Sequence, residues 1–598
     1  MAELQSTMNM PDPVLWAQTV TRIADKSQRL VSDFLRRQAD DGALDLESSA
    51  AIGNAFLDMT QQMMANPGKL VEAQMALWRG YVDLWSTSAA AFFGQQVEPV
   101  VEPEHGDRRF KHDDWQENFL FNFVKQSYLL TARWFQNTAG DLDGLDPKSK
   151  RKIEFYTRQF VDALAPTNFP ITNPEVLRAT VESGGENLLK GLSNLLDDLA
   201  RGKGKLNIRM TDLNAFELGQ NVACTPGKVV YQTDLMQLIH YQPTTETVYR
   251  RPLMVIPPWI NKFYILDLRP KNSFIKWWVD QGFSVFVLSW VNPDERLAEK
   301  NFEDYLQEGP LAALDAIEQA TGEREVNALG YCLGGTLLAC AMAYLAAKKD
   351  TRIQSATYMT TMLDFEQPGE LEVFIDEEQI NSLEKRMERR GYLDGSEMAT
   401  TFNMLRANDL IWSFFINNYL LGKEPFPFDL LYWNSDSTRM PAKMHSFYLW
   451  NMYQRNLLKE PNGISLAGQG IDLGKVTTPT YFLSAIEDHI APWKSTYAGT
   501  HLFSGPVRFV LGGSGHIAGA INPPAAEKYC YWTNADIPTT PEQWFAGAEQ
   551  HKGSWWLDWL DWVQQYSGEQ VPARLPGDNQ LKILEDAPGA YAKQRIAA

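Results

Sequence analysis

The chain has 598 residues, of which 44% are hydrophobic and 12% aromatic, a composition typical of folded proteins with more than one domain and not of disordered ones. Its 74 Asp and Glu residues outnumber its 55 Lys and Arg residues, and the net charge of −19 argues against a nucleic-acid-binding protein while leaving room for an anionic small ligand. Four cysteines in so long a chain exclude a disulfide framework and fit a reducing compartment.

No targeting or membrane-spanning segment is expected. Residues 1–6 lack the basic and apolar pattern of a signal peptide, and no apolar run reaches the length of a membrane span. The sequence therefore predicts a cytoplasmic protein.

Residues 1–200 are predicted to form an α-helical N-terminal domain. An aromatic stretch covers residues 115–135. The Pro-containing segment 97–104, which precedes it, predicts an extended linker. We expect the apolar stripes of this domain to pack against each other, with contact to a partner or an apolar phase as the alternative. In residues 69–85 the spacing alternates between four and three, which places five side chains in one helical stripe: Val71, Met75, Trp78, Val82 and Trp85.

A polar break at residues 201–205 marks the predicted start of a second domain, residues 201–598. Here short apolar strands alternate with helical stretches, which is typical of a mostly parallel sheet with helices on both faces. Residues 229–231 and 238–241 predict an antiparallel hairpin. Further strands are predicted at 253–256, 284–290, 326–329, 356–359, 480–484 and 507–511.

The connection between residues 364 and 479 is far longer than an ordinary crossover. Aromatic and aliphatic residues are frequent in it, which predicts a cap over an active site, at about residues 365–440. We expect aromatic side chains of this insertion to keep water from the site: Phe414, Phe415, Phe426 and Phe428.

A cysteine stands where a nucleophile elbow would carry serine. Residues 330–335 read Gly-Tyr-Cys-Leu-Gly-Gly, between the predicted strand 326–329 and a predicted helix. A strand, a tight turn and a helix form the context in which a G-x-S-x-G motif presents a nucleophile above an α/β-hydrolase sheet. A thiol at Cys332 would form a thioester, so it predicts acyl transfer from another thioester. On this motif alone, a structural core cysteine remains the alternative.

The predicted base and acid follow later strands, in the order nucleophile, acid, histidine. Asp488 comes after the strand ending near residue 484, and His516 stands in a Gly-rich loop after the strand ending at residue 511. We therefore expect Cys332, Asp488 and His516 to form a catalytic triad. Four other histidines fit less well, because they lie in the cap, beside the acid, or in or beside helical stretches: His445, His489, His501 and His551.

The oxyanion hole is expected from two places. One N–H should come from Leu333, directly after the nucleophile, and the other from the loop after the early strand, where Ile260 and Asn261 are the candidates.

Taken together, these motifs resemble those of polyhydroxyalkanoate synthases. The resemblance covers residues 212–562, and other α/β-hydrolases with a cysteine nucleophile lack this set of motifs. The matching segments are residues 257–268, 330–335, 487–493, 513–519, 522–524 and 553–556.

The resemblance implies an α/β-hydrolase fold and the polymerisation of (R)-3-hydroxyacyl-CoA into a polyester with release of CoA. A single long chain with an N-terminal helical region is similar to the class I type. That class implies short monomers such as 3-hydroxybutyryl-CoA, a homodimer, a mobile cap, and attachment to polymer granules and granule-associated proteins. It implies no resident cofactor or metal, since the CoA thioester is the substrate. Asp488 would either orient His516 or assist the hydroxyl directly.

Two other functions stay open at this point. A thioesterase or cysteine-dependent lactone hydrolase on the same fold would release free acid instead of polymer. A non-enzymatic granule-coating protein would carry an inactive elbow, and thiol alkylation would leave its function unchanged.

Overall fold

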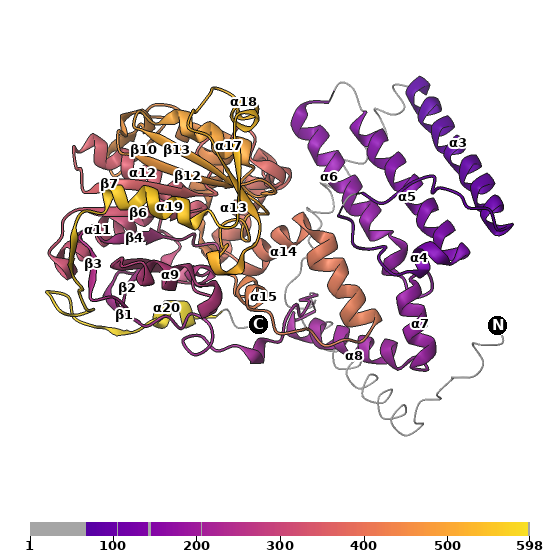
Figure 1. Ribbon diagram of the computed structural model, residues 1–598, viewed down its shortest axis with the longest axis horizontal. Helices are drawn as coiled ribbons and strands as arrows, with labels where there is room; N and C mark the ends of the chain where they lie inside the picture. Colours follow the sequence, from indigo (N-terminus) through magenta and orange to yellow (C-terminus); the bar gives the residue numbers. More distant parts are fainter. Residues whose placement is uncertain (1–66, 105, 142–144, 205, 596–598) are drawn as a thin grey trace. The chain divides into compact units, whose positions relative to one another are not determined.

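The computed structural model describes residues 67–104, 106–141, 145–204 and 206–595 (Figure 1). It divides into two compact units. Among the described residues, the helical unit combines residues 67–212 with Asn403–Phe426, and the sheet unit combines Leu213–Phe402 with residues 427–595. Residues 1–6, used for the signal-peptide prediction, lie outside the described residues. In the part of the chain that is described, no helix is both long and apolar enough to cross a membrane.

The helical unit is built from helices whose starts are specified by local sequence. The side chains of Asn118, Asp146 and Asn173 accept hydrogen bonds from N–H groups of the helices that follow them, and proline occupies the first turn after two of these caps. The helices are α3 (Pro67–Phe92), α4 (Asp114–Glu117), α5 (Phe119–Gly140), α6 (Pro147–Ala163), α7 (Pro174–Glu182) and α8 (Glu186–Arg201).

The stripe on α3 is largely exposed, so the expectation that the apolar stripes of this domain pack against each other is met only at one end, where the Trp85 ring lies edge-on to Phe123 of α5 with centroids 5.3 Å apart. Trp78 and Trp85 are 72% and 65% exposed, and the other three members of the stripe are also exposed. Beside the stripe, α3 also packs on α5 through Leu84, which is fully buried, and through the Tyr81 hydroxyl, which bonds to Thr131 at 2.8 Å. Helix α5 thus leaves most of the α3 stripe exposed.

Part of the predicted cap belongs to the helical unit. Residues 403–426 include the π-helix η9 (Phe415–Leu420), which packs on α8. The Tyr419 hydroxyl donates to Asp198 at 2.6 Å, and a Cβ at Gly191 would lie 1.7 Å from the Tyr419 carbonyl oxygen. Only glycine permits this approach. The sequence placed the whole insertion in residues 201–598, whereas this segment groups with the first unit.

The sheet unit holds one eleven-stranded sheet in the order β15-β14-β13-β12-β7-β6-β4-β5-β2-β1-β17. The strands from β13 to β5 pair in parallel, and those outside them pair antiparallel. The predicted hairpin and the six further predicted strands are all present. Their bounds are β1 (Gly227–Gln232), β2 (Met236–Tyr241), β4 (Leu253–Ile256), β5 (Val285–Trp290), β6 (Val326–Tyr331), β7 (Ile353–Met359), β12 (Thr480–Ala485) and β13 (Val507–Gly512).

Helices cover both faces of this sheet, as predicted for an α/β fold. One hydrophobic cluster includes α11 (Ala312–Thr321), α12 (Leu333–Ala347) and α17 (Trp493–Gly499). The other includes α9 (Phe274–Asp280) and α19 (Trp556–Val563). The outer strands are β14 (Cys530–Thr533), β15 (Glu549–Lys552) and β17 (Glu585–Asp586), and a separate pair joins β3 (Thr247–Tyr249) to β16 (Gln570–Pro572).

The rest of the insertion stays in the sheet unit. Strand β8 (Tyr392–Leu393) pairs with β9 (Met440–Pro441). This pairing joins the two ends of the segment that contains residues 403–426. The other elements are α13 (Glu377–Arg390), α14 (Gly395–Leu405), which runs into the 403–426 segment, α15 (Asp429–Asn434), α16 (Ala442–Tyr448), the π-helix η10 (Leu449–Gln454), β10 (Ile464–Leu466) and β11 (Gln469–Ile471). Helix α18 (Pro541–Ala546) precedes β15, and α20 (Gly589–Lys593) follows β17.

Candidate active site

Cys332 stands in a strained turn between β6 and α12. Its backbone has φ 52° and ψ −122°, a conformation that residues other than glycine adopt only at a cost in free energy. Its N–H donates to the Met359 carbonyl at 2.9 Å, and its own carbonyl accepts from Gly335 at 2.9 Å. The thiol is half-buried and lies at the N-terminal end of a long helix, where negative charge is stabilised.

The glycines of the motif are required by close packing. A Cβ on Gly330 would lie 2.4 Å from the Cα of Gly335, and one on Gly334 would lie 2.0 Å from the carbonyl oxygen of Ile256. A Cβ on Gly335 would lie 2.0 Å from Thr361 Oγ1. The elbow is thus wedged between its own helix, the end of β4 and the loop after β7.

Asp488 and His516 lie together at the carboxyl ends of β12 and β13. His516 Nδ1 lies 2.6 Å from Asp488 Oδ2, and because a carboxylate only accepts, the imidazole donates here. The other carboxylate oxygen accepts from the N–H groups of Ile490 and Ala491 at 2.8 and 2.9 Å. This arrangement leaves Nε2 of His516 as the nitrogen that can exchange a proton with a neighbouring group.

The electrostatics link His516 to both other members of the predicted triad. Burial on its own would lower the pKa of His516, but the charges of Asp488 and Cys332, and hydrogen bonds to both, outweigh it and raise that pKa to about 10. The structure therefore brings Cys332, Asp488 and His516 together, with the imidazole bonded to both other side chains.

The other histidines are placed elsewhere. His445 is buried in α16, where burial lowers its pKa to about 4. His501 contacts the ring of Tyr497, and His551 lies in strand β15 and bonds to Thr533, not in or beside a helix as the sequence suggested. The ion pair with Asp488 is formed by His516, at 2.6 Å.

The predicted oxyanion loop lies against the elbow. A side chain at Gly334 would meet the carbonyl oxygens of Ile256 and Pro257, which begin this loop. Leu333 is the first residue of α12, so its N–H has no acceptor within the helix. In the described chain, the N–H groups of Ile260 and Asn261 donate to no backbone carbonyl. All three N–H groups remain candidates for binding an oxyanion.

Two tyrosines at this site were missed by sequence reasoning. Burial raises the pKa values of Tyr448 and Tyr453, and the charge of the nearby Cys332 raises both further. Their ring centroids are 5.5 Å apart. They are five residues apart, and the π-helical repeat of η10 places residues at this spacing on one face. The spacing was visible in the sequence, but the π-helix was not.

The four phenylalanines expected to exclude water are divided between the units. Phe414, Phe415 and Phe426 belong to the segment that groups with the helical unit, and Phe428 is 45% exposed. In the sheet unit, the insertion contributes Tyr448 and Tyr453, whose pKa values the charge of Cys332 raises. The described residues hold no group of three or more His, Cys, Asp and Glu side chains suited to a metal ion.

A mostly parallel sheet with helices on both faces and a strained strand-to-helix turn defines an α/β-hydrolase fold, and the model of that fold matches residues 266–523. A second family model, the N-terminus of poly-beta-hydroxybutyrate polymerase (PhaC), matches residues 106–278.

The chain is 48% identical over 586 residues to the poly(3-hydroxyalkanoate) polymerase subunit PhaC of Rhizobium meliloti, covering 98% of this chain and 96% of that protein. It is 41% identical to the Cupriavidus necator polymerase subunit over 554 residues, covering 92% of each. The chain therefore belongs to the poly(3-hydroxyalkanoate) polymerases, which are acyltransferases, and the resemblance found in the sequence is confirmed. The class I type is consistent with these relatives.

Solved structures resemble the chain more distantly. A hydrolase from Pseudomonas aeruginosa is 14% identical with a TM-score of 0.31, and covers 50% of this chain and 95% of its own. The thioesterase domain from the curacin pathway is 11% identical with a TM-score of 0.28, and covers 49% and 94%.

Proposed function

We propose that the chain polymerises (R)-3-hydroxyacyl-CoA, with 3-hydroxybutyryl-CoA as the preferred monomer, through a thioester on Cys332. The observation that carries this proposal is the position of His516, hydrogen-bonded to Asp488 and coupled in charge to Cys332. A thiol at an elbow with a paired imidazole is the arrangement that nucleophilic acyl transfer requires.

In the first step, the Cys332 thiolate attacks the carbonyl carbon of the CoA thioester. The carbonyl oxygen becomes an oxyanion, which the N–H groups of Leu333 and of the loop after β4 stabilise. The bond to the CoA sulfur then breaks, and the proton held by His516 passes to the departing thiolate. CoA leaves as the free thiol, and the acyl group remains on Cys332.

In the second step, the 3-hydroxyl of another unit attacks the Cys332 thioester. His516 takes the hydroxyl proton, the new ester bond forms, and the Cys332 thiolate is released. Asp488 either orients the imidazole or assists the hydroxyl directly. The conversion of a thioester into an oxoester is favourable, so the reaction needs neither ATP nor a resident cofactor.

Water competes with the hydroxyl for the acyl group. Tyr448, which is buried, and Tyr453, which is partly buried, both feel the charge of Cys332 and support a water-excluding site in which hydrolysis is slow.

The assembled enzyme is proposed to be a homodimer on the surface of cytoplasmic polymer granules. The exposed α3 stripe supports this part of the proposal, because large apolar patches mark surfaces that meet a partner or an apolar phase. The helical unit would then serve association, with the growing polyester and granule-associated proteins as partners.

The test is incubation with 3-hydroxybutyryl-CoA, following CoA release and turbidity together. Polymerisation gives both signals in step. CoA release with free 3-hydroxybutyrate and no turbidity would make the protein a thioesterase instead, and an absence of CoA release would favour a non-enzymatic granule protein.

A further inference from the structure

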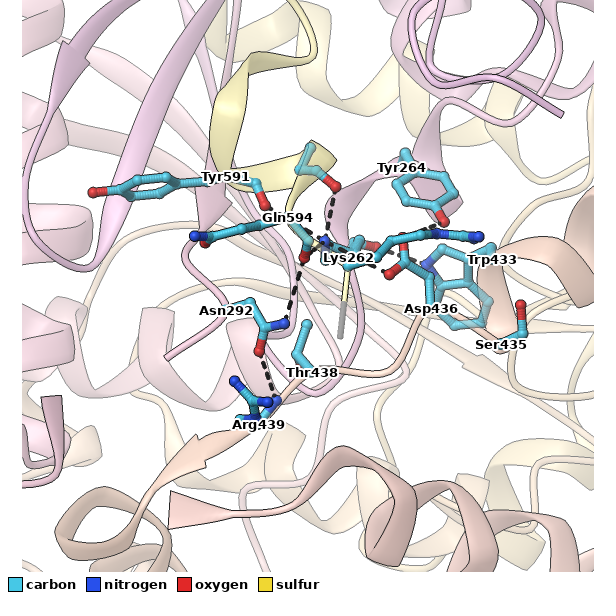
Figure 2. Close-up of polar contacts among 12 residues, drawn as sticks. Lys262, Tyr264, Asn292, Trp433, Ser435, Asp436, Thr438, Arg439, Tyr591 and Gln594 are labelled. Carbon is cyan, nitrogen blue, oxygen red and sulfur yellow. Dashed lines mark hydrogen bonds and ion pairs between the residues drawn. The ribbon is translucent and has the colours of Figure 1, made fainter. Parts of the chain in front are cut away.

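A buried lysine lies directly after the candidate oxyanion loop. Lys262 and Asp436 each have a side chain only 1% exposed, with Nζ 3.6 Å from Oδ1 (Figure 2). The Asp436 carboxylate also accepts from the Tyr264 hydroxyl at 2.8 Å and lies 3.4 Å from Arg595. Burial lowers the pKa of Lys262, and the charge of Asp436 opposes that shift.

The ammonium group is satisfied by backbone carbonyls from the far end of the chain. Lys262 Nζ donates to the carbonyl oxygens of Ala592 and Gln594 at 2.7 and 2.6 Å, and lies 3.4 Å from that of Tyr591. Figure 2 shows the ammonium group between this C-terminal segment and Asp436. A buried ion pair costs desolvation free energy and is poor evidence of stabilisation by itself, which suggests a role in fixing one conformation.

The segment that carries Asp436 also holds the oxyanion loop. Thr438 Oγ1 donates to the Trp259 or the Ile260 carbonyl oxygen, which lie 2.5 and 2.6 Å away, and the Thr438 N–H lies 3.3 Å from the latter. Asn261 forms an antiparallel bridge with Ser437. At the other end of the loop, the Trp433 indole donates to the Lys262 carbonyl at 2.7 Å.

These contacts determine where the free N–H groups point. In a trans peptide, the carbonyl of one residue and the N–H of the next point in opposite directions. Because Thr438 binds the carbonyls of Trp259 and Ile260, the N–H groups of Ile260 and Asn261 point away from the segment containing Thr438.

We infer that Lys262 is a positioning residue, which ties the oxyanion loop to the segment 436–438 and to the C-terminal residues and so holds the Ile260 and Asn261 N–H groups in place for the acylation step. The inference rests on the proposed function. Lys262 acts through the loop and does not itself touch the reacting atoms.

Two reactions of Cys332 separate positioning from general stability. Alkylation by iodoacetamide needs the thiolate but no oxyanion hole, whereas the burst of CoA from 3-hydroxybutyryl-CoA in a single turnover needs both. In Lys262→Met we expect the burst rate to fall about 10- to 100-fold, with alkylation within about twofold of the wild type. The steady-state kcat should fall more than KM rises, because the N–H groups act mainly in the transition state.

Thr438→Val tests the same loop from its other side and keeps the size of the side chain. It should lower the burst rate in the same direction, again without slowing alkylation. In Lys262→Met, Asp436 retains Tyr264 and Arg595 as partners, so its charge is not left unpaired. Lys125→Met removes another buried lysine, from α5 of the helical unit, and should leave both reactions unchanged.

The outcomes distinguish this inference from the function it rests on. If burst and alkylation fall in parallel in both variants, Lys262 has only a structural role. If neither variant slows the burst while the wild type releases CoA, the inference fails and the proposed function stands. If the wild type itself releases no CoA, the proposed function fails, and this inference fails with it.

Discussion

Two groups of tryptophans, one in each unit, are covered in opposite ways. In the sheet unit, Trp278, Trp556 and Trp559 are fully buried, and Phe274 stacks on Trp556 with ring centroids 3.8 Å apart. In the helical unit, Trp78 and Trp85 lie on the exposed stripe of α3. The first set forms a core that packs against the elbow residue Cys332, and the second forms a surface.

The difference shows that an apolar period identifies a face of a helix but not what covers that face. Both regions have the spacing of a packed element. The comparison predicts that changes in the sheet unit alter chemistry and stability, whereas changes on the α3 stripe alter association.

The largest effect should come from Cys332→Ala, which removes the nucleophile. CoA release should fall on the order of 10⁶-fold, the scale for losing a nucleophile that acts as part of a unit. Cys224→Ala, Cys340→Ala and Cys530→Ala should keep most activity, because none of these residues lies at an elbow. CoA release is the measurement, and substantial turnover by Cys332→Ala would overturn the assignment.

The next effect concerns the base and its partner. His516→Gln should lower acylation by a factor on the order of 10⁴ or more, because the thiol loses its proton acceptor. Asp488→Asn should retain some acylation and impair elongation more. His489→Gln is the matched control and should be milder than His516→Gln. Single-turnover CoA release measures acylation, and polymer length measures elongation. A more damaging His489 variant would show that the wrong histidine was chosen.

The raised pKa of His516 makes a pH prediction with a defined sign. A pKa raised from 6.5 to about 10 stabilises the fold fully below about pH 6.5, and this contribution is lost as the pH rises through 10. Asp488→Asn removes the charge that raises the pKa of His516 most. The pH range over which the unfolding free energy falls should therefore shift to lower pH. Denaturant unfolding of both proteins between pH 6 and 10 measures it, and identical slopes would contradict the coupling.

A smaller effect compares the two kinds of tryptophan directly. Trp556→Ala removes a buried ring that stacks on Phe274 and donates to the Ala520 carbonyl, and should cost about 3–5 kcal/mol of unfolding free energy. Trp78→Ala removes an exposed ring and should change that free energy by less than about 0.5 kcal/mol. Denaturant titration measures both. Equal losses would mean that the stripe is buried in the protein as it exists in solution.

Local patterns predicted the sheet and the strand-to-helix elbow well. The strands from β4 to β13 and the elbow at Cys332 are encoded in short apolar runs and glycines, so the sequence locates them without knowledge of the rest of the fold. Asp488 and His516 could be found because the ends of parallel strands meet at one edge of the sheet.

Other features depend on contacts between distant segments and could not be predicted. The return of residues 403–426 to α8 requires glycine at 191, but a glycine inside a helical pattern has many explanations. The satisfaction of Lys262 by the carbonyls of Ala592 and Gln594 spans more than half of the chain and involves no side-chain motif. The covered face of α3 is decided by α5, not by its own sequence.

Changes to the α3 stripe should have the smallest effect on chemistry. They test most directly the comparison between exposed and buried tryptophans. Trp78→Ser combined with Trp85→Ser replaces two exposed rings with small polar side chains, so it should leave kcat in dilute solution within about twofold and the unfolding free energy nearly unchanged. It should weaken dimerisation or attachment to polymer granules, because these processes would bury the apolar stripe. Sedimentation measures the first and granule fractionation the second.

The matched control for this variant changes exposed polar positions of the same helix, Glu72→Ala with Arg79→Ala, which lie between members of the stripe. It should retain wild-type mass and granule binding. If both double variants behave like the wild type in mass, granule attachment and activity, then the exposed stripe serves neither dimerisation nor granule attachment. The contrast between the two groups of tryptophans then lies only in how they are packed. If the stripe variant lowers kcat in dilute solution at unchanged mass, the helical unit affects the chemistry by another route, and the division of roles proposed here is wrong.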